Sequence, residues 1–302
     1  MKLGCISDIH IDVNRDFAVL ELLAQKVRDR RLDALVIAGD ISNHYTTTLS
    51  FLDRFIPLAG VPVYFVPGNH DMWDQSGGVS DSHEIYRRYQ AHPACLIDRS
   101  VPLGDDWVLI GDIGWYDYSF GNPRYGYDAF SARKLGERTW LDSLYVRWNQ
   151  PDPEVHRDML ARLSARLRTL RGKKIVTVTH MIAERYFIVP EGIGQWAYFN
   201  AFLGSKAYGE LFERAHVRHS IMGHVHYRKR CTISGVDYIC ACLNYHTQWA
   251  GDDLEKELDN ALTVLELEEQ DTERPGEPHV QETMRMSYKP DAAAGMRARL
   301  TW

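Results

Sequence analysis

The chain has 302 residues, of which 45% are hydrophobic and 25% charged, the composition of an ordinary globular protein with a sizeable core. Its net charge of −6 disfavours nucleic-acid binding through a broad basic face, although a local basic groove stays open as an alternative. No apolar run approaches the roughly 20 residues of a membrane span, and the first run leads directly into Asp8 and His10, so we expect no cleavable signal peptide and a cytoplasmic protein.

Strands and helices alternate through the first part of the chain. The expected elements are a strand at 2–7, a helix at 16–31, a strand at 34–38, a helix at 46–56 and a strand at 61–66. We expect Pro57 to end the second helix, because proline disrupts helix interiors. Strands that alternate with helices pair in parallel through right-handed crossovers, which predicts an α/β fold.

The rest of the chain continues this pattern with longer connections. The expected elements are a helix at 82–90, a strand at 107–111, a helix at 153–171, and strands at 174–179, 217–222, 231–233, 236–243 and 261–267. Gly172 is expected to cap the long helix, and Ser234-Gly235 to form a hairpin turn. Because the composition shifts to Glu, Pro, Gly and Arg, we expect one domain over 1–267 and a polar tail over 268–302.

Polar side chains follow five of the predicted strands. They are Asp8, His10, Asp40, Asn69, His70, His180, His224 and His226. A single Asp in such a place is usually a cap or turn residue, and a single buried His is usually hydrogen-bonded core. So many together are better explained by a shared ligand, because the carboxyl ends of strands in an open sheet converge at the binding edge.

The chemistry of these side chains points to divalent metal ions. Carboxylate and imidazole groups suit manganese, iron, zinc or cobalt. The five cysteines show no CxxC spacing, so we expect them to be reduced and mostly buried and a structural zinc site to be absent. Gly39, Gly68 and Gly223 each precede a candidate ligand, either to turn the backbone sharply or as ordinary turn residues.

These motifs resemble those of a known family. Asp8-Ile9-His10, Gly39-Asp40, Gly68-Asn69-His70-Asp71, His180 and Gly223-His224-Val225-His226 are similar to the five signature blocks of the calcineurin-like metallophosphoesterases, in the family order. The stretch GDIGWYDYS at 111–119 also resembles a bacterial subgroup of phosphoesterases. The resemblance implies a four-layer αββα sandwich of two mixed sheets, the metallo-dependent phosphatase-like fold.

The resemblance also implies two divalent ions with Asp40 as their bridge. The first would take Asp8, His10, Asp40 and His226, and the second Asp40, Asn69, His180 and His224. The metals would be Mn, Fe, Zn, Ni or Co, with Mn or Fe favoured. A metal-bridging hydroxide would attack phosphorus, and His70 would act as general acid or stabilise the transition state. Asp71 is expected to orient its loop rather than to contact the ions.

One departure from the family bears on the substrate. Members that act on phosphoproteins usually carry Asp-Arg-Gly shortly after the Gly-Asp block, but here the chain continues Ile41-Ser42-Asn43-His44. The missing Arg favours diesters or small phosphorylated molecules. Asn43, in the place of the Asp of that subgroup, either supports His70 or caps a turn.

Two aromatic-rich inserts, at about 112–150 and 185–205, separate the motifs. Each is either a surface insert packed by its own aromatic rings or a cap that binds substrate. We take Tyr116, Asp117 and Arg124 as candidate substrate contacts, together with Asn43. His246 either faces the cleft or is structural.

We therefore expect a dinuclear metal-dependent phosphoesterase, in the first place a phosphodiesterase, with a small phosphorylated substrate. Its rivals within the enzymes are a cyclic-nucleotide phosphodiesterase, a nucleotide or lipid pyrophosphatase and a nuclease. A metal-dependent esterase for other esters also stays open. A non-catalytic metal-binding scaffold is the alternative from another class, and the complete set of ligand residues disfavours it.

Overall fold

The first three predicted strands lie side by side in one sheet of the computed structural model, which describes residues 1–268. β1 (Lys2–Ile6), β2 (Ala34–Ala38) and β3 (Val63–Val66) run parallel in that order. The last strand, β12 (Thr263–Glu266), pairs antiparallel with the free side of β1. This sheet is therefore mixed, and it joins the two ends of the described chain.

The second sheet has six strands in the order β10-β11-β9-β8-β5-β4. Their bounds are β4 (Ser100–Leu103), β5 (Trp107–Asp112), β8 (Lys174–Thr179), β9 (His219–Met222), β10 (Arg228–Ile233) and β11 (Val236–Ala241). The four central strands are parallel and the two edge pairs antiparallel. The hairpin predicted at Ser234-Gly235 is confirmed, and both residues have the positive φ (50° and 81°) of a type I′ turn.

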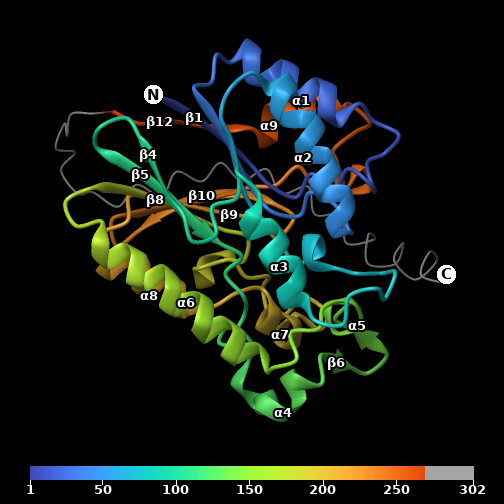
Figure 1. Ribbon diagram of the computed structural model, residues 1–302. Coiled ribbons are helices and arrows are strands. Elements are labelled where there is room, and N and C mark those ends of the chain that lie inside the picture. Colours follow the sequence, from blue (N-terminus) through green and yellow to red (C-terminus); the bar gives the residue numbers. More distant parts are fainter. Residues whose placement is uncertain (269–302) are drawn as a thin grey trace.

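The alternation of side chains along the strands builds the layers. Leu3 and Cys5 of β1 face the other sheet, whereas Leu35 and Ile37 of β2 face helices. The helices on this outer side are α1 (Val19–Asp29), α2 (Tyr45–Ala59), α3 (Ser82–Ala91) and α9 (Leu254–Ala261). α6 (Asp152–Thr169) and α8 (Lys206–Arg214) cover the second sheet (Figure 1). The predicted four-layer αββα sandwich of two mixed sheets is confirmed.

Some predicted boundaries are wrong. α1 is shorter than the helix expected at 16–31. α2 continues through Pro57 to Ala59 and ends at Gly60, which has a φ of 70°. Pro57 lies in the last turn of α2, where the loss of one hydrogen bond costs little against the burial of Phe55 and Ala59. The long helix α6 ends at Thr169, short of the expected cap at Gly172.

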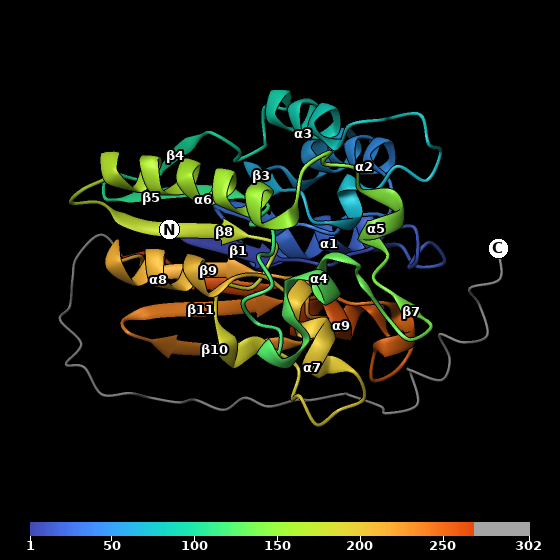
Figure 2. The ribbon, with the colours of Figure 1, turned by 90° about the horizontal axis from the view of Figure 1, so that it is seen from below.

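The two inserts form short elements that pack on each other. They contain α4 (Gly126–Ser131), β6 (Lys134–Leu135), β7 (Arg138–Thr139), α5 (Asp142–Tyr145) and α7 (Trp196–Phe199), and the 3₁₀ turns Pro123–Tyr125, Arg185–Phe187 and Asn200–Phe202. The Asn122 N–H donates to the Ala197 carbonyl at 2.8 Å, and the Tyr198 hydroxyl to the Ala129 carbonyl at 2.6 Å. Figure 2 shows α4 and α7 side by side in front of the sheets.

Other expectations meet the structure in part. All five cysteines are free and buried, as predicted. Among the helices of the described chain, none is long and apolar enough to cross a membrane. The tail predicted at 268–302 lies, apart from its first residue, outside the described residues.

Candidate metal centre

Loops from both sheets meet at one edge of the sandwich. Asp8 and His10 follow β1, Asp40 follows β2, Asn69 follows β3, His180 follows β8, and His224 and His226 follow β9. We call these seven residues the ligand cluster. A parallel bridge between Ser7 and Cys242 joins the two sheets here, and the His224 N–H lies 3.0 and 3.1 Å from the two carboxylate oxygens of Asp8. The polar residues at the strand ends are therefore brought together in space.

One half of the cluster contains Asp8, His10, Asp40 and His226, whose possible ligand atoms all lie within 4.8 Å of one another. The Nε2 atoms of His10 and His226 are 3.2 Å apart. His10 Nε2 lies 3.7 Å from Asp40 Oδ2, and His226 Nε2 lies 3.5 Å from Asp8 Oδ1. Four donors that converge in this way could hold one cation.

The other half shares Asp40 with the first and adds His180 and His224. His180 Nε2 lies 3.3 Å from Asp40 Oδ2 and 3.2 Å from His224 Nδ1. Asn69 completes this half, because its Oδ1 lies 3.0 Å from His180 Nε2. Asp40 is thus the common member of two sets of donors.

The bonding of these groups fits divalent cations. Asp40 is 1% exposed, and its Oδ2 accepts no well-aligned hydrogen bond from the described part of the chain, although His180 Nε2 lies 3.3 Å away. In each of the two imidazole pairs, His10 with His226 and His180 with His224, two ring nitrogens face each other at 3.2 Å. Two such nitrogens can share only one proton, so each pair directs at least one nitrogen lone pair into the space where an ion could bind. Buried acceptors without partners are costly, and a cation between them removes that cost. The residues present therefore fit two metal ions.

The imidazoles of the cluster differ in their electrostatics. Burial opposes a charge on His180, but the neighbouring Asp40 carboxylate raises its pKa to about 9, so a bound cation must displace that proton. Burial, helped by the neighbouring imidazoles, lowers the pKa of His10 and of His224 well below its ordinary value. Both rings are therefore neutral at physiological pH, which is the state that binds metal. Burial raises the pKa of Asp40 to about 6 despite the opposing effect of His180. The ionised carboxylate of Asp40 is therefore disfavoured until a cation binds beside it.

The backbone at the cluster is strained. Five of its members have a positive φ: Asp8 (51°), His10 (38°), Asp40 (54°), His224 (72°) and His226 (53°). Each such residue costs on the order of 1 kcal/mol when it is not glycine. Residues held in this region gather at functional sites, where the surrounding structure enforces them.

The glycines beside the ligands have two different reasons. Gly39 has a φ of +82°, so here the predicted conformational freedom is needed. Gly68 and Gly223 are not in the left-handed region of φ. At these two positions glycine is required because there is no room for a Cβ atom. A Cβ on Gly68 would lie 2.1 Å from Asp40 Oδ1, and one on Gly223 would lie 2.6 Å from Asp8 Oδ2.

His70 lies beside the cluster rather than within it. Its Nε2 is 3.9 Å from Asp40 Oδ2, its ring stacks on Trp73 with centroids 3.8 Å apart, and its side chain is 15% exposed. Its Nδ1 lies 2.6 Å from Asn43 Oδ1. Of the two roles considered for Asn43, this contact favours support of the His70 ring. The cap of α2 is His44, whose side chain accepts from the Thr46 N–H.

Asp71 ties two ligand-bearing loops together. Its carboxylate accepts backbone N–H groups from Gly68, Ile41 and Ser42 at 2.8 to 3.1 Å. It also accepts the hydroxyl of Thr48 at 2.5 Å. These bonds fix the loops after β2 and β3 relative to each other, which is the orienting role expected of Asp71.

Three predicted substrate contacts do not join the cluster. Tyr116 is fully buried and donates its hydroxyl to Asp142 at 3.2 Å. Asp117 accepts from the Ser205 hydroxyl and the Ser119 N–H, and Arg124 bonds to its neighbour Tyr125. Tyr116 thus packs inward with other aromatic residues of the insert, and its role as a substrate contact stays a prediction.

Other residues near the cluster escaped the sequence reasoning. The Tyr245 ring lies 4.6 Å from that of His10 and 4.5 Å from that of His226. The next residue, His246, begins the 3₁₀ turn His246–Gln248, and its ring packs against Phe17 and Trp249. These contacts favour the structural role for His246. Asp142 and Trp73 also lie here, and no sequence pattern marks either of them.

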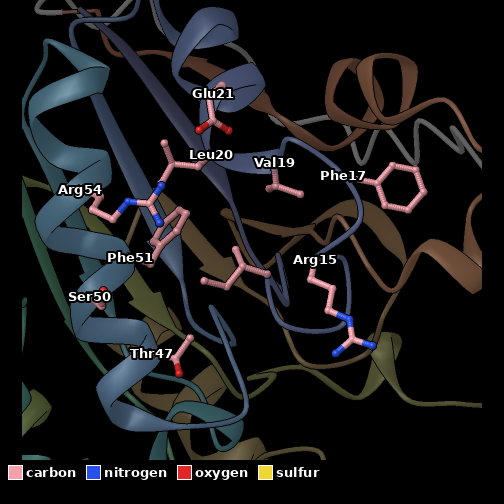
Figure 3. A pocket seen from close by; sticks show the side chains of 10 residues that line it. Arg15, Phe17, Val19, Leu20, Glu21, Thr47, Ser50, Phe51 and Arg54 are labelled. Carbon is pink, nitrogen blue, oxygen red and sulfur yellow. The ribbon is translucent and has the colours of Figure 1, made fainter.

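A separate open pocket of about 280 Å³ lies between α1 and α2 (Figure 3). It is lined by Ile11, Arg15, Phe17, Val19, Leu20, Glu21, Thr47, Ser50, Phe51 and Arg54. Figure 3 shows Arg54 reaching from α2 toward Leu20 of α1. No member of the ligand cluster lines this pocket, so its shape says nothing about the metal centre.

Comparisons with known proteins agree with this geometry. Residues 1–228 match the model of the family described as calcineurin-like phosphoesterase. A probable cyclic nucleotide phosphodiesterase of Fibrobacter succinogenes is 35% identical over 82 residues, which are 24% of this chain and 31% of that protein. The matched region thus spans about a third of that relative's length.

Solved structures show the same fold. The Mycobacterium tuberculosis phosphopantetheinyl hydrolase superimposes with a TM-score of 0.68 at 18% identity, over 91% of this chain and 98% of that one. The Thermus thermophilus protein TT1561 gives a TM-score of 0.50 at 14% identity, over 87% and 97%. The family match covers most of the described chain and all members of the ligand cluster. The chain belongs to the calcineurin-like phosphoesterase family.

Proposed function

We propose that this phosphoesterase is a dinuclear metal-dependent phosphodiesterase that acts on a small phosphorylated substrate. The observation that carries the proposal is the buried carboxylate of Asp40, which is shared by two sets of metal-capable side chains and whose Oδ2 accepts no well-aligned hydrogen bond within residues 1–268. An arrangement this costly in the empty protein supports metal binding, and the match to the calcineurin-like phosphoesterase family supports catalysis over a metal-binding scaffold.

The ligand cluster divides between two ions. Asp8, His10, Asp40 and His226 would hold one. Asp40, His180 and His224, together with Asn69, would hold the other. When bound, such ions lower the pKa of water and neutralise charge on phosphoryl oxygens. Carboxylate, amide and imidazole ligands suit Mn or Fe, with Zn, Ni and Co as further candidates.

His70 supplies the proton that the leaving oxygen needs. Asn43 Oδ1, an acceptor, holds the proton on Nδ1 and leaves Nε2 directed toward Asp40. Burial lowers the pKa of His70, so the resting ring is neutral with Nε2 unprotonated, and Nε2 must first take up a proton, which it would then pass readily to the leaving oxygen. Trp73 stacks on one face of the ring and keeps it in this orientation.

A diester is favoured over a phosphoprotein monoester. No Arg follows Asp40 in the loop that begins Ile41-Ser42-Asn43, so the cation that would bind the second charge of a monoester is missing there. The name of the Fibrobacter relative, a probable cyclic nucleotide phosphodiesterase, supports the same choice.

The test is hydrolysis by metal-stripped protein reloaded with manganese, iron, nickel, zinc or cobalt in turn. We expect bis-p-nitrophenyl phosphate to be cleaved faster than p-nitrophenyl phosphate, with two ions bound per chain. A chain that binds two ions and cleaves neither compound with any metal would refute a general phosphodiesterase. Faster cleavage of the monoester would overturn the diester preference alone.

A further inference from the structure

A carboxylate of the first insert lies directly behind the metal centre. Asp142 begins α5 and is 1% exposed. Its Oδ1 accepts from Asn69 Nδ2 and Trp73 Nε1, both at 2.8 Å. Its Oδ2 accepts from Trp140 Nε1 at 2.8 Å and from the Tyr116 hydroxyl at 3.2 Å. One buried carboxylate thus collects four donors from three separate parts of the chain.

The contact with Asn69 decides which end of the amide faces the cluster. A carboxylate only accepts, so the Asn69 group that faces Asp142 must be the NH₂. The amide oxygen then faces His180 Nε2 at 3.0 Å, on the side of the shared donors. An amide turned the other way would present an N–H, which cannot bind a cation. Asp142 therefore makes Asn69 usable as an oxygen ligand.

Two further donors connect Asp142 with other residues of the centre. Trp73, held through its indole N–H, stacks on the ring of His70 with centroids 3.8 Å apart. Trp140, held in the same way, packs edge-on against His224 at 5.8 Å. Both indoles are thus fixed by the same carboxylate that fixes Asn69.

We propose that Asp142 is a positioning residue through which the first insert orients the Asn69 side of the metal centre. The inference rests on the proposed function, because it presupposes that Asn69 binds a metal ion. It gives the insert a role beyond packing on its own aromatic rings. Outer partners of metal ligands typically change metal affinity by about 10- to 100-fold when they are removed.

The same part of the chain offers a matched control. Asp152 begins α6, is 2% exposed, and accepts from Trp115 Nε1 at 2.7 Å and from the Tyr118 hydroxyl at 2.5 Å. It also pairs with Arg133. These three partners are neither members of the ligand cluster nor stacked on one. Asp152→Asn therefore disturbs the insert without a direct path to the metal centre.

The experiment measures metal bound per chain during equilibrium dialysis against a series of free manganese concentrations. We compare the wild type with Asp142→Asn, Asp142→Ala and Asp152→Asn, and record the thermal midpoint of each metal-free protein. Asp142→Asn keeps the shape of the side chain but replaces one accepting oxygen by an NH₂ group, which cannot accept the hydrogen bonds that Asp142 receives. We expect it to bind one ion normally and the other about 10- to 100-fold more weakly, with full occupancy restored at high manganese.

Two results would overturn the inference. One is wild-type affinity for both ions in Asp142→Asn, and the other is an equal loss in Asp152→Asn, which would assign the effect to general loosening of the insert. A wild-type chain that fails to bind two ions would instead refute the proposed function, and the wild-type measurement alone would show it.

A double-variant cycle guards against a merely structural explanation. If Asp142 acts through Asn69, then Asn69→Ala combined with Asp142→Asn should bind the second ion no more weakly than Asn69→Ala alone. Losses that add up would contradict the proposed path. Because this comparison uses binding and not turnover, it does not depend on finding a substrate.

Discussion

Two clusters of Asp and His, one at the amino end of β9 and one beyond its carboxyl end, differ in how their charges are satisfied. At the amino ends of β9 and β11, Asp237 accepts from His219 Nδ1 at 2.8 Å and from two nitrogens of Arg230 at 2.6 and 2.8 Å. In the ligand cluster, Asp40 Oδ2 accepts no well-aligned hydrogen bond within the described chain, and imidazoles face one another.

The backbone makes the same distinction. His219 and Asp237 lie in regular strands, paired with each other in register. Asp8, Asp40 and His226 all have a positive φ. A structural ion cluster is complete within the protein, whereas a cluster built for a ligand keeps strained backbone and unsatisfied acceptors. This contrast marks the candidate metal centre better than the residue types do, because Asp and His occur in both clusters.

The largest effect should come from Asp40→Asn, which removes the group common to both sets of donors. We expect a loss of about 5 kcal/mol of transition-state stabilisation, or roughly 10⁴-fold in the rate of diester hydrolysis. Metal bound per chain should fall at the same time. Full metal content together with wild-type turnover would remove Asp40 from its central place.

His70→Ala should separate proton transfer from metal binding. We expect the rate to fall on the order of 10²–10³-fold, while two ions remain bound, because His70 lies beside the cluster. Parallel measurement of kcat and of metal content checks this. Loss of an ion from this variant would show that His70 is a ligand after all.

Removal of metal should destabilise the protein through the ligand cluster alone. Each ion present at 100 times its dissociation constant stabilises the folded state by about 2.7 kcal/mol. Dialysis against a chelator should therefore lower the thermal midpoint of the wild type. The Asp237→Asn variant should show the same drop, whereas Asp40→Asn should show a much smaller one.

Asp237→Asn should give the smallest effect, confined to stability. Burial alone would raise the pKa of Asp237, but the hydrogen bonds from His219 and Arg230 hold it below its ordinary value. A carboxyl with a lowered pKa stabilises the fold above the pKa of the unfolded state, near 3.9, and loses this as the pH falls through its folded value.

At pH 7 we therefore expect Asp237→Asn to be less stable than the wild type by about 1.5 kcal/mol. The difference should shrink as the pH falls below about 4, because the wild-type carboxyl is then protonated as well. Denaturant unfolding at several pH values checks this. A difference in catalytic rate between the two proteins would contradict the assignment of this cluster to structure.

The sequence was sufficient to find the members of the ligand cluster because each follows an apolar strand within a short motif. It could not find Asp142, whose partner Asn69 is 73 positions away and whose own surroundings show no pattern. The burial of Tyr116 could not be predicted for a related reason, because the inward or outward direction of an aromatic side chain in an irregular insert depends on tertiary packing.

Some missed elements did leave a signal. Tyr208, Leu211 and Phe212 follow helical spacing in α8, and their burial confirms that this stripe faces the second sheet. The strained φ values at Asp8 and Asp40 left none, since aspartate in a loop motif does not reveal its backbone angle. Position along the chain could thus be read, but the conformation enforced by neighbouring loops could not.

The pairing of β1 with β12 has a consequence for synthesis on the ribosome. β1 carries the first two ligands, yet one of its neighbours, β12, is the last strand of the described chain. Translation must therefore extend past Glu266 before this strand can be enclosed on both sides. Asp8 and His10 are therefore made long before their strand has neighbours on both sides, which happens only when nearly all of the sandwich has been made.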